Sequence, residues 1–250
     1  MIRIVTIVTA LSALAATAIA AEIKVMTTGA PKQVVQTVAD GFQTATGHKV
    51  TFIQDTAGGV RRRIEAGESA DIIVATPEVL NALTTAGKVA AGSQVDFART
   101  GVGVGIKEGM PKPDISTTEA FKRFITETPA LALPDPAAGG TSAVFLAGLF
   151  QRLGLTEAVK AKAKFQAGGY AADLIVKGEA VAVVHQISEI LPVKGVALVG
   201  PLPAEIQLIS TYTAALPAGT AGEAARAFMA ALGGPQGAAA ARAAGMDPVR

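Results

Sequence analysis

Short runs of β-branched and apolar residues alternate with amphipathic stretches from residue 22 onward, and this alternation constrains the fold most. The pattern is typical of α/β proteins, in which helices join largely parallel strands and cover the sheet. Two rounds of similar size follow one another. The first round predicts strands at 22–26, 50–54 and 71–75, and helices at 31–45, 60–66 and 77–86.

After the first round come a Pro-rich loop at 111–116 and a predicted helix at 118–127, and the second round then begins with the strand at 130. It predicts strands at 130–133, 180–184 and 196–200, and helices at 160–165 and 171–176, with a long helix that ends at Leu153. Further β segments at 98–106 and 206–214 could link the two rounds, and helices at 222–232 and 237–244 close the chain.

The composition excludes several classes of protein. Half of the 250 residues are hydrophobic, which is too many for a disordered chain. The formal net charge of +2 argues against a nucleic-acid-binding protein, which needs a basic surface to neutralise phosphates. The absence of Cys excludes disulfides, Cys-ligated zinc, iron–sulfur clusters and thiol nucleophiles, and two His leave little room for a His-rich metal site.

Residues 1–20 read as a signal peptide. Arg3 gives a short basic start, residues 4–16 form an apolar segment, and Ala18-Ile19-Ala20 is a cleavage site of the small-x-small type. The apolar segment is shorter than the ~20 residues of a membrane span. We therefore expect cleavage after Ala20. Without a Cys to carry a lipid, an exported protein of this kind is expected to lie free in a Gram-negative periplasm.

Three predicted strand ends carry small hydroxyl and glycine residues, namely Thr27-Thr28-Gly29, Thr56-Ala57-Gly58-Gly59 and Gly140-Thr141-Ser142. Each opens a helix, whose first backbone N–H groups lack partners and lie at the positive end of the helix dipole. Several such loops that converge form an anion site without Lys or Arg. The alternative is that each loop is an ordinary helix cap.

Two side chains could add to such a site. Of Arg61-Arg62-Arg63, only one can face a cleft, and Arg61 lies nearest the second loop; the alternative is a solvated helix face. His185 follows the apolar run at 180–184, at a strand end where α/β sheets bind ligands, or else it is a structural residue. His48 is interpreted as a turn residue without a role.

Other motifs fail. Gly87-Lys88 lacks the upstream glycine of a phosphate-binding loop, and no G-x-S-x-G sequence surrounds Ser142. Asp55, Asp71 and Asp135 could ligate a cation, but local structural roles explain them. We therefore expect no metal and no cofactor.

Four motifs, taken in order, give the chain a family resemblance. They are Gly67-Glu68-Ser69-Ala70-Asp71-Ile72 before Ala75-Thr76, Ala132-Leu133-Pro134-Asp135-Pro136 with Gly139-Gly140-Thr141-Ser142, Gly178-Glu179-Ala180, and Ala244-Gly245-Met246-Asp247-Pro248. Together they resemble the type II periplasmic solute-binding proteins, and among these the molybdate-binding branch, over essentially the whole mature chain.

The resemblance implies an α/β fold of two lobes, each a mostly parallel sheet flanked by helices, with a ligand cleft between them. Lobe 1 would comprise residues 21–100 and 205–250, and lobe 2 residues 101–204. The ligand contacts carried over from the family are Thr28, Thr56, Ser142 and the residue after the strand at 180–184. With the loops and side chains above, the candidate ligand-binding residues are Thr27, Thr28, Thr56, Gly58, Arg61, Thr76, Gly140, Thr141, Ser142, His185 and Gln186.

The chain departs from the molybdate-binding pattern in its late segment. Molybdate-binding proteins typically have a tyrosine there, whereas this chain reads His185-Gln186-Ile187-Ser188-Glu189. That segment, followed by Gly200-Pro201-Leu202-Pro203, resembles a side branch of the family that includes periplasmic aconitate isomerases. The ligand is therefore an oxyanion such as molybdate or a small organic carboxylate.

Two functions follow from these observations. The first is a monomeric binding protein that closes its lobes on a small anion and delivers it to an ABC permease of the inner membrane, with no nucleic-acid partner. The alternative is an isomerase that moves a proton within an unsaturated tricarboxylate. His185 would then be the catalytic base, Glu189 is a poorer candidate, and Arg61 with the strand-end hydroxyls would hold carboxylates. A sensor of a membrane partner fits the same sequence as the binding protein.

Overall fold

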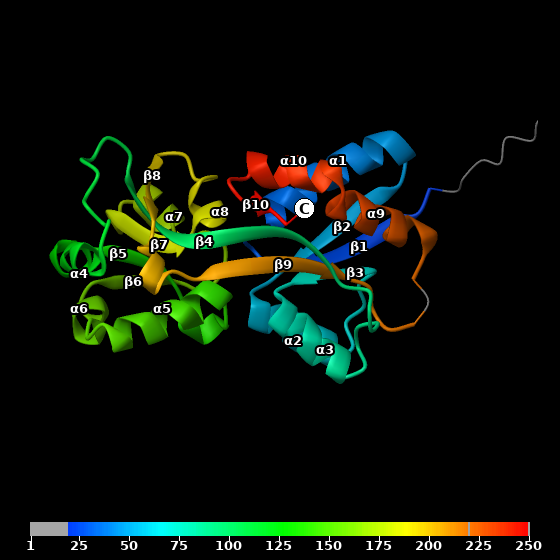
Figure 1. Ribbon diagram of the computed structural model, residues 1–250, viewed down its shortest axis with the longest axis horizontal. Coiled ribbons are helices and arrows are strands. Elements are labelled where there is room, and N and C mark those ends of the chain that lie inside the picture. Colours follow the sequence, from blue (N-terminus) through cyan, green and yellow to red (C-terminus); the bar gives the residue numbers. More distant parts are fainter. Residues whose placement is uncertain (1–19, 220, 250) are drawn as a thin grey trace, which may run out of the picture.

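The computed structural model describes residues 20–219 and 221–249. Apart from Ala20, the predicted signal peptide lies outside these residues. The described chain forms two α/β lobes joined by long strands that run from one lobe into the other (Figure 1).

Lobe 1 combines the beginning and the end of the described chain. Its parallel strands stand in the order β2-β1-β3. They are β1 (Glu22–Thr27), β2 (Lys49–Gln54) and β3 (Ile72–Ala75). The helices of this lobe are α1 (Lys32–Thr46), α2 (Ala57–Glu65), α3 (Pro77–Thr85), α9 (Glu223–Gly233) and α10 (Pro235–Ala243).

Lobe 2 is built from the middle of the chain and repeats this plan. Its parallel strands β7, β5 and β6 are neighbours, and β8 lies against β4. The strands are β5 (Leu131–Pro134), β6 (Ala163–Gln166), β7 (Ala182–Gln186) and β8 (Val196–Pro201). The helices are α4 (Thr118–Glu127), η1 (Pro136–Ala138), α5 (Thr141–Arg152), α6 (Thr156–Lys160), α7 (Asp173–Val176), α8 (Ile187–Ile190) and η2 (Ala204–Ile206).

Two antiparallel strands connect the lobes, β4 (Val95–Lys107) and β9 (Ile209–Ala215), and the short β10 (Asp247–Pro248) adds to β4. The first half of β4 pairs with β9, and its second half pairs with β7 and β8. The sheet order is therefore β2-β1-β3-β9-β4-β7-β5-β6. The predicted linking segments at 98–106 and 206–214 fall on these strands. The exact division of the chain at 100/101 and 204/205 stays a prediction.

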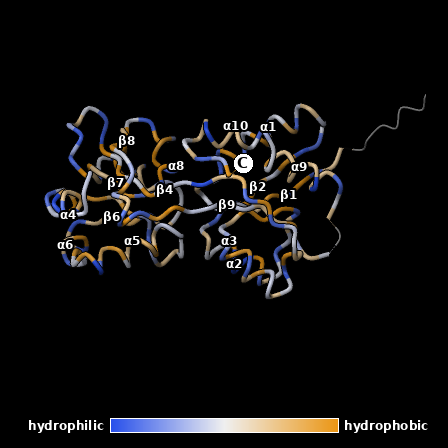
Figure 2. The backbone as a smooth tube through the Cα atoms, viewed as in Figure 1, coloured by the Kyte–Doolittle hydropathy of each residue, from blue (hydrophilic) through white to orange (hydrophobic). Residues whose placement is uncertain are grey.

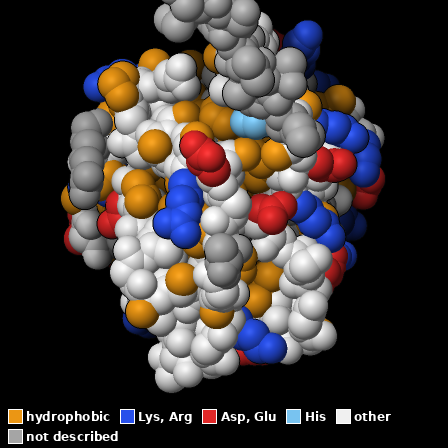
Figure 3. Space-filling view, turned by 90° about the vertical axis from the view of Figure 1, so that its right-hand side faces the viewer, with side chains coloured by type: hydrophobic (Ala, Val, Ile, Leu, Met, Phe, Trp, Pro, Cys, Tyr) orange, Lys and Arg blue, Asp and Glu red, His pale blue; other side chains and the backbone are white. Residues whose placement is uncertain are grey.

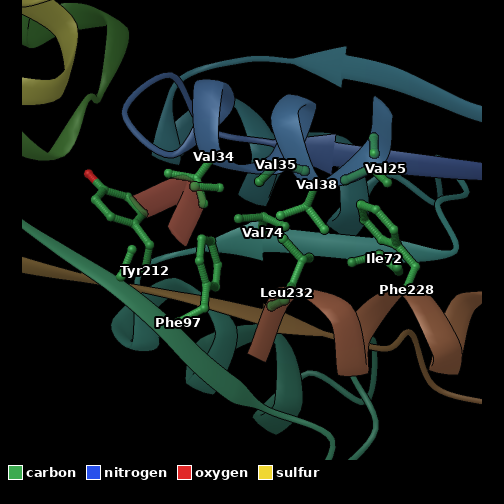
Figure 4. Close-up of a cluster of buried hydrophobic side chains, with 14 of the residues drawn as sticks. Val25, Val34, Val35, Val38, Ile72, Val74, Phe97, Tyr212, Phe228 and Leu232 are labelled. Atoms are coloured by element: carbon green, nitrogen blue, oxygen red, sulfur yellow. The ribbon is translucent and has the colours of Figure 1, made fainter. Parts of the chain in front are cut away.

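The apolar residues of each lobe pack into two cores, one on each face of its sheet. On α1 the spacing of Val34, Val38 and Phe42 puts them on one buried helix face, and Gly47 ends the helix in the left-handed conformation (φ 74°). α9 and α10 cover the same face of the sheet as α1 (Figure 4), and α2 and α3 cover the other. Apolar stretches run through both lobes (Figure 2).

Three sequence expectations need correction. Residues 160–165, predicted as a helix, instead contain the edge strand β6, because parallel pairing of Ala163–Gln166 with β5 outweighs local helix propensity. The helix predicted at 60–66 begins at Ala57, which makes Thr56 its N-cap. The strand predicted at 180–184 runs over Ala182–Gln186, so His185 and Gln186 are its last residues and do not follow it.

On the end of lobe 1 shown in Figure 3, Lys and Arg side chains lie beside Asp and Glu side chains. Lys49 and Glu22, for example, form an exposed ion pair with a distance of 3.6 Å. None of the helices in the described ranges 20–219 and 221–249 is long and apolar enough to cross a membrane.

Candidate functional site

A cavity of about 290 Å³ lies between the two lobes. Residues at or after the carboxyl ends of β1, β2, β5, β6 and β7 form most of its wall, which is where α/β sheets bind ligands. The predicted site residues that line it are Thr28, Thr56, Gly140, Thr141, Ser142, His185 and Gln186. Those that do not line it are Thr27, Gly58, Arg61 and Thr76.

The loop after β1 contributes Thr28, a cavity-lining residue whose buried hydroxyl is unpaired among the described residues. Thr28 is 5% exposed, and its backbone N–H donates to the Val74 carbonyl at 3.1 Å. Its side-chain Oγ1 has no hydrogen-bond partner among the described residues. An unpaired buried hydroxyl costs about 1–3 kcal/mol, so a ligand that bonds to it gains that free energy.

The first turn of α5 provides further polar groups in the cavity wall, its backbone N–H groups, which are unpaired within the helix. Its N-cap is Gly140, which has no side chain to accept from the first N–H groups of the helix. Thr141, Ser142 and Ala143 form its first turn, line the cavity and have no partner within the helix for their N–H groups. These N–H groups and the helix dipole favour an anion at this end of the cavity.

The loop after β2, which was expected to bind an anion, is instead hydrogen-bonded to lobe 2. Thr56 Oγ1 accepts from the Gly59 N–H (3.0 Å) and donates its own proton to the Ala138 carbonyl in lobe 2 (2.6 Å). The Gly58 N–H donates to the Gly139 carbonyl at 3.0 Å. This helix start therefore joins the lobes, and the Thr56 hydroxyl has no proton left for an anion.

Arg61, which was predicted to face the cleft, lies outside the cavity. Its exposed guanidinium pairs with Glu65 on the next turn of α2, with Nε 2.8 Å from Oε1. Arg62 is the arginine that turns toward lobe 2: its Nη1 lies 3.2 Å from the point where a Cβ on Gly58 would stand, and 4.0 Å from that point on Gly139. The rotation of 100° per residue in a helix separates the two directions.

Two further threonines of the predicted site, Thr27 and Thr76, are buried and do not line the cavity. Thr27 is fully buried at the end of β1, and its hydroxyl donates to the Thr28 carbonyl (3.1 Å). Thr76 is the N-cap of α3 and is also buried away from the cavity. The Thr27 hydroxyl thus has a local partner, and neither threonine is among the residues that line the cavity.

The charges on the cavity wall are acidic. Among the described residues no Lys or Arg lines the cavity, whereas Asp55, Asp135 and Glu189 do. Asp55 pairs with Arg63 at 2.8 Å, and Asp135 accepts a backbone N–H at 2.9 Å. These two aspartates, which the sequence offered as cation ligands, thus have local partners.

His185 and Glu189 form a buried pair at the lobe 2 side of the cavity. His185 Nε2 lies 3.3 Å from Glu189 Oε2, and His185 Nδ1 has no partner among the described residues. Burial lowers the pKa of His185 to about 4 and raises the pKa of Glu189 to about 8. At pH 7 both groups are therefore mainly neutral, an imidazole beside a protonated carboxyl group.

Gln186 fixes the position of the linking strand β9. Its amide nitrogen donates to Ser210 Oγ (3.1 Å), and its amide oxygen accepts from the Tyr212 hydroxyl (2.6 Å). Burial raises the pKa of Tyr212 above its ordinary value of 10, so its hydroxyl keeps its proton. Gln186 lines the cavity, but its amide is committed to the connection between the lobes.

The wall contains residues that the sequence analysis did not place in a binding site. Glu189 was considered only as a poorer catalytic base, and Tyr212, Gln54 and Gln166 were not considered. One signal was present for Glu189: it lies only four residues after His185, in the segment that follows the same strand. Tyr212 lies on β9, far along the chain, and no local pattern marks it.

Fold and cavity together define a two-lobed α/β protein with a cavity between its lobes. The sequence model for "Bacterial extracellular solute-binding protein" matches residues 23–247. The chain belongs to this family, and the two-lobed fold expected from the sequence is confirmed.

The chain is similar to one curated relative and, in its fold, to two solved structures. The relative is an aconitate isomerase of a Pseudomonas species, 30% identical over 232 residues that cover 90% of this chain and 87% of the relative. The periplasmic molybdate-binding protein of Azotobacter vinelandii is similar in structure, with a TM-score of 0.74, 21% identity, and 90% and 98% of the two chains covered. The sulfate-binding protein SubI of Mycobacterium tuberculosis H37Rv gives a TM-score of 0.68 and 19% identity, with 92% and 87% covered.

Proposed function

We propose that the protein captures a small organic carboxylate in the cavity between its lobes and delivers it, from the periplasm, to an ABC permease of the inner membrane. The observation that carries this proposal is the uncapped start of α5 in a cavity wall that also contains Thr28, with its unpaired hydroxyl, and no Lys or Arg among the described residues. Neutral donors of this kind bind an anion and still allow its release.

The size of the cavity favours a carboxylate over a tetrahedral oxyanion such as molybdate. Its volume of about 290 Å³ lies at the lower end of the range of small-molecule sites, roughly 300–1,000 Å³. A tetrahedral oxyanion would leave much of this space to water. Glu189, protonated at neutral pH, adds a donor that suits a carboxylate oxygen.

Lobe closure is the mechanism that the proposal implies. β4 and β9 connect the lobes, and the loops after β2 and β5 contact each other across the cleft through Thr56–Ala138 and Gly58–Gly139. An anion that touches both lobes favours the closed arrangement by its binding free energy.

A second candidate function is a proton-transfer isomerase acting on an unsaturated tricarboxylate. The buried pair of His185 and Glu189 in the cavity favours it, because such chemistry needs a base beside an acidic C–H bond. The 30% identity to an aconitate isomerase also supports it. The acidic cavity wall, without Lys or Arg, makes a tricarboxylate less suited than a smaller anion.

A thermal-shift screen of the mature protein tests the leading proposal. The compounds are succinate, cis- and trans-aconitate, sulfate, phosphate, molybdate and tungstate. A compound at about 100 times its Kd should stabilise the protein by about 2.7 kcal/mol, which is a clear shift. A shift with sulfate or molybdate and none with any carboxylate would contradict the choice of ligand class.

Thr28→Val should weaken binding of the best anion by about 1–3 kcal/mol, roughly 5- to 150-fold, because the ligand loses one charge-assisted hydrogen bond. The stability of the unliganded protein should not fall, since the hydroxyl that is removed has no partner. Calorimetric titration and urea unfolding measure the two effects. Thr85→Val on the exposed side of α3 is the matched control. Equal loss of binding in both variants would show that Thr28 does not contact the anion.

His185→Gln separates the two candidate functions. If the protein only binds, wild-type protein should leave trans-aconitate unchanged, and the variant should keep its affinity within about tenfold. Chromatographic detection of the cis isomer measures turnover. If the wild type turns over trans-aconitate and the rate falls by about a hundredfold or more in His185→Gln, the binding-protein proposal is refuted in favour of the isomerase.

A further inference from the structure

Glu189 reaches across the cleft from lobe 2 to lobe 1. Its Oε1 lies 2.5 Å from the point where a Cβ on Gly29 would stand, in the loop after β1. Its other carboxyl oxygen faces His185 Nε2 at 3.3 Å. The residue is 8% exposed, and what remains exposed lies in the cavity wall. The absence of a side chain at Gly29 therefore makes room for a carboxyl group that belongs to the ligand site.

No described cation balances a negative charge at this position. The titratable side chains on the elements packed against Glu189 are His185 at the end of β7, Tyr212 on β9 and Tyr170 before α7. The nearness of the Glu189 charge contributes to a raised pKa in both tyrosines, after the larger effect of burial. All three neighbours are neutral at pH 7, so an ionised Glu189 would have no counter-ion.

Two other residues of the cavity wall carry carboxylates. Asp55 at the end of β2 is balanced by Arg63, and Asp135 after β5 accepts only a backbone N–H. An anion that enters the cavity thus meets an aspartate and, if Glu189 is ionised, a second carboxylate. Like charges held in a site of low dielectric repel each other strongly.

We propose that Glu189 binds the anion as a carboxylic acid, donating its O–H to the ligand, and that above neutral pH each binding event takes up a proton. This inference rests on the proposed binding of an anion and adds a contact residue and a proton to it. Oε2 lies beside His185 Nε2, so the proton is placed on Oε1, the oxygen on the side of Gly29. An O–H···O⁻ bond of this type is among the short, strong hydrogen bonds.

The pH dependence follows from burial. The pKa of Glu189 is raised to about 8, so the acid form that the ligand requires is fully present below pH 7 and is lost as the pH rises through 8. If the ionised form does not bind, affinity should fall by about tenfold between pH 7 and pH 9.

Calorimetric titration tests the inference directly. Affinities for trans-aconitate, succinate, sulfate and molybdate are compared at pH 7, and the tightest of the four is followed to pH 9 in two buffers of different ionisation enthalpy. The wild type should lose about tenfold in affinity and take up close to one proton per anion at pH 9. These anions are largely ionised above pH 7, so the proton goes to the protein.

Two variants complete the test. Glu189→Gln keeps a neutral donor, so its affinity should stay within about twofold from pH 7 to pH 9, without proton uptake. Glu127→Gln, on an exposed position of α4, should keep the wild-type profile. A flat wild-type profile, or an unchanged slope in Glu189→Gln, would overturn the inference while leaving anion binding intact. Failure of all four anions to bind at pH 7 would instead refute the proposed function. The wild-type proton uptake decides the matter even if Glu189→Gln does not fold.

Discussion

Replacing Phe228 by alanine should lower the free energy of unfolding by about 3–5 kcal/mol, the usual cost of removing a large aromatic side chain from a core. Phe228 is 0% exposed, on the inner face of α9 (Figure 4). Its ring meets that of Phe42 edge to face, with centroids 5.3 Å apart and an angle of 73°. The variant removes this contact and leaves a cavity between α1, α9 and the sheet of lobe 1.

Urea unfolding followed by circular dichroism measures this loss. Phe165→Ala is the matched control, because Phe165 on the edge strand β6 is 50% exposed and should cost less than about 1.5 kcal/mol. A similar loss in both variants would mean that the core on α1 and α9 is not a main source of stability. If unfolding occurs in two transitions and Phe228→Ala shifts only one of them, the two lobes unfold independently.

The fold could be predicted from the sequence because local signals agree with the final packing. The run Ile72–Ala75 is entirely buried, as a central strand with a helix on each side requires. The spacing of Val34, Val38 and Phe42 predicts the helix and the face that it buries. The error at residues 160–165 arose where these signals are weak, on an edge strand half exposed to solvent.

The site could be predicted only in part. Strand-end loops are visible in the sequence, so Thr28 and the start of α5, which line the cavity, could be proposed from it. The sequence does not show which hydrogen-bonding groups will be paired with residues of the other lobe. Thr56 resembles Thr28 locally, yet its hydroxyl donates to a carbonyl of lobe 2. The same limit explains Arg61, since the direction of a side chain in a helix depends on where the helix begins. Glu189 becomes a site residue only because Gly29 lies opposite it.

The backbones of the two lobes meet beside the cavity where Gly58 contacts Gly139. A Cβ on Gly58 would stand 3.3 Å from the Gly139 carbonyl oxygen and 3.4 Å from its Cα. An alanine there is tight, whereas the branched side chain of valine would enter the space that Gly139 occupies. Gly58 lies in the first turn of α2 with an ordinary helical backbone, so the substitution should strain the lobe contact and leave the helix itself intact.

Gly58→Val should therefore hold the lobes apart and weaken anion binding by about thirtyfold or more. Overpacking costs about 1–3 kcal/mol, and loss of the Gly58–Gly139 and Thr56–Ala138 hydrogen bonds adds about 0.5–1.5 kcal/mol each, so the closed state loses at least about 2 kcal/mol. Titration calorimetry measures the affinity, and small-angle X-ray scattering should show a larger radius of gyration. Gly41→Val on α1, where an added side chain meets nothing within 4 Å, should change neither. Wild-type affinity and scattering in Gly58→Val would mean that the lobes close on the anion without this contact, and that the loops after β2 and β5 only neighbour each other.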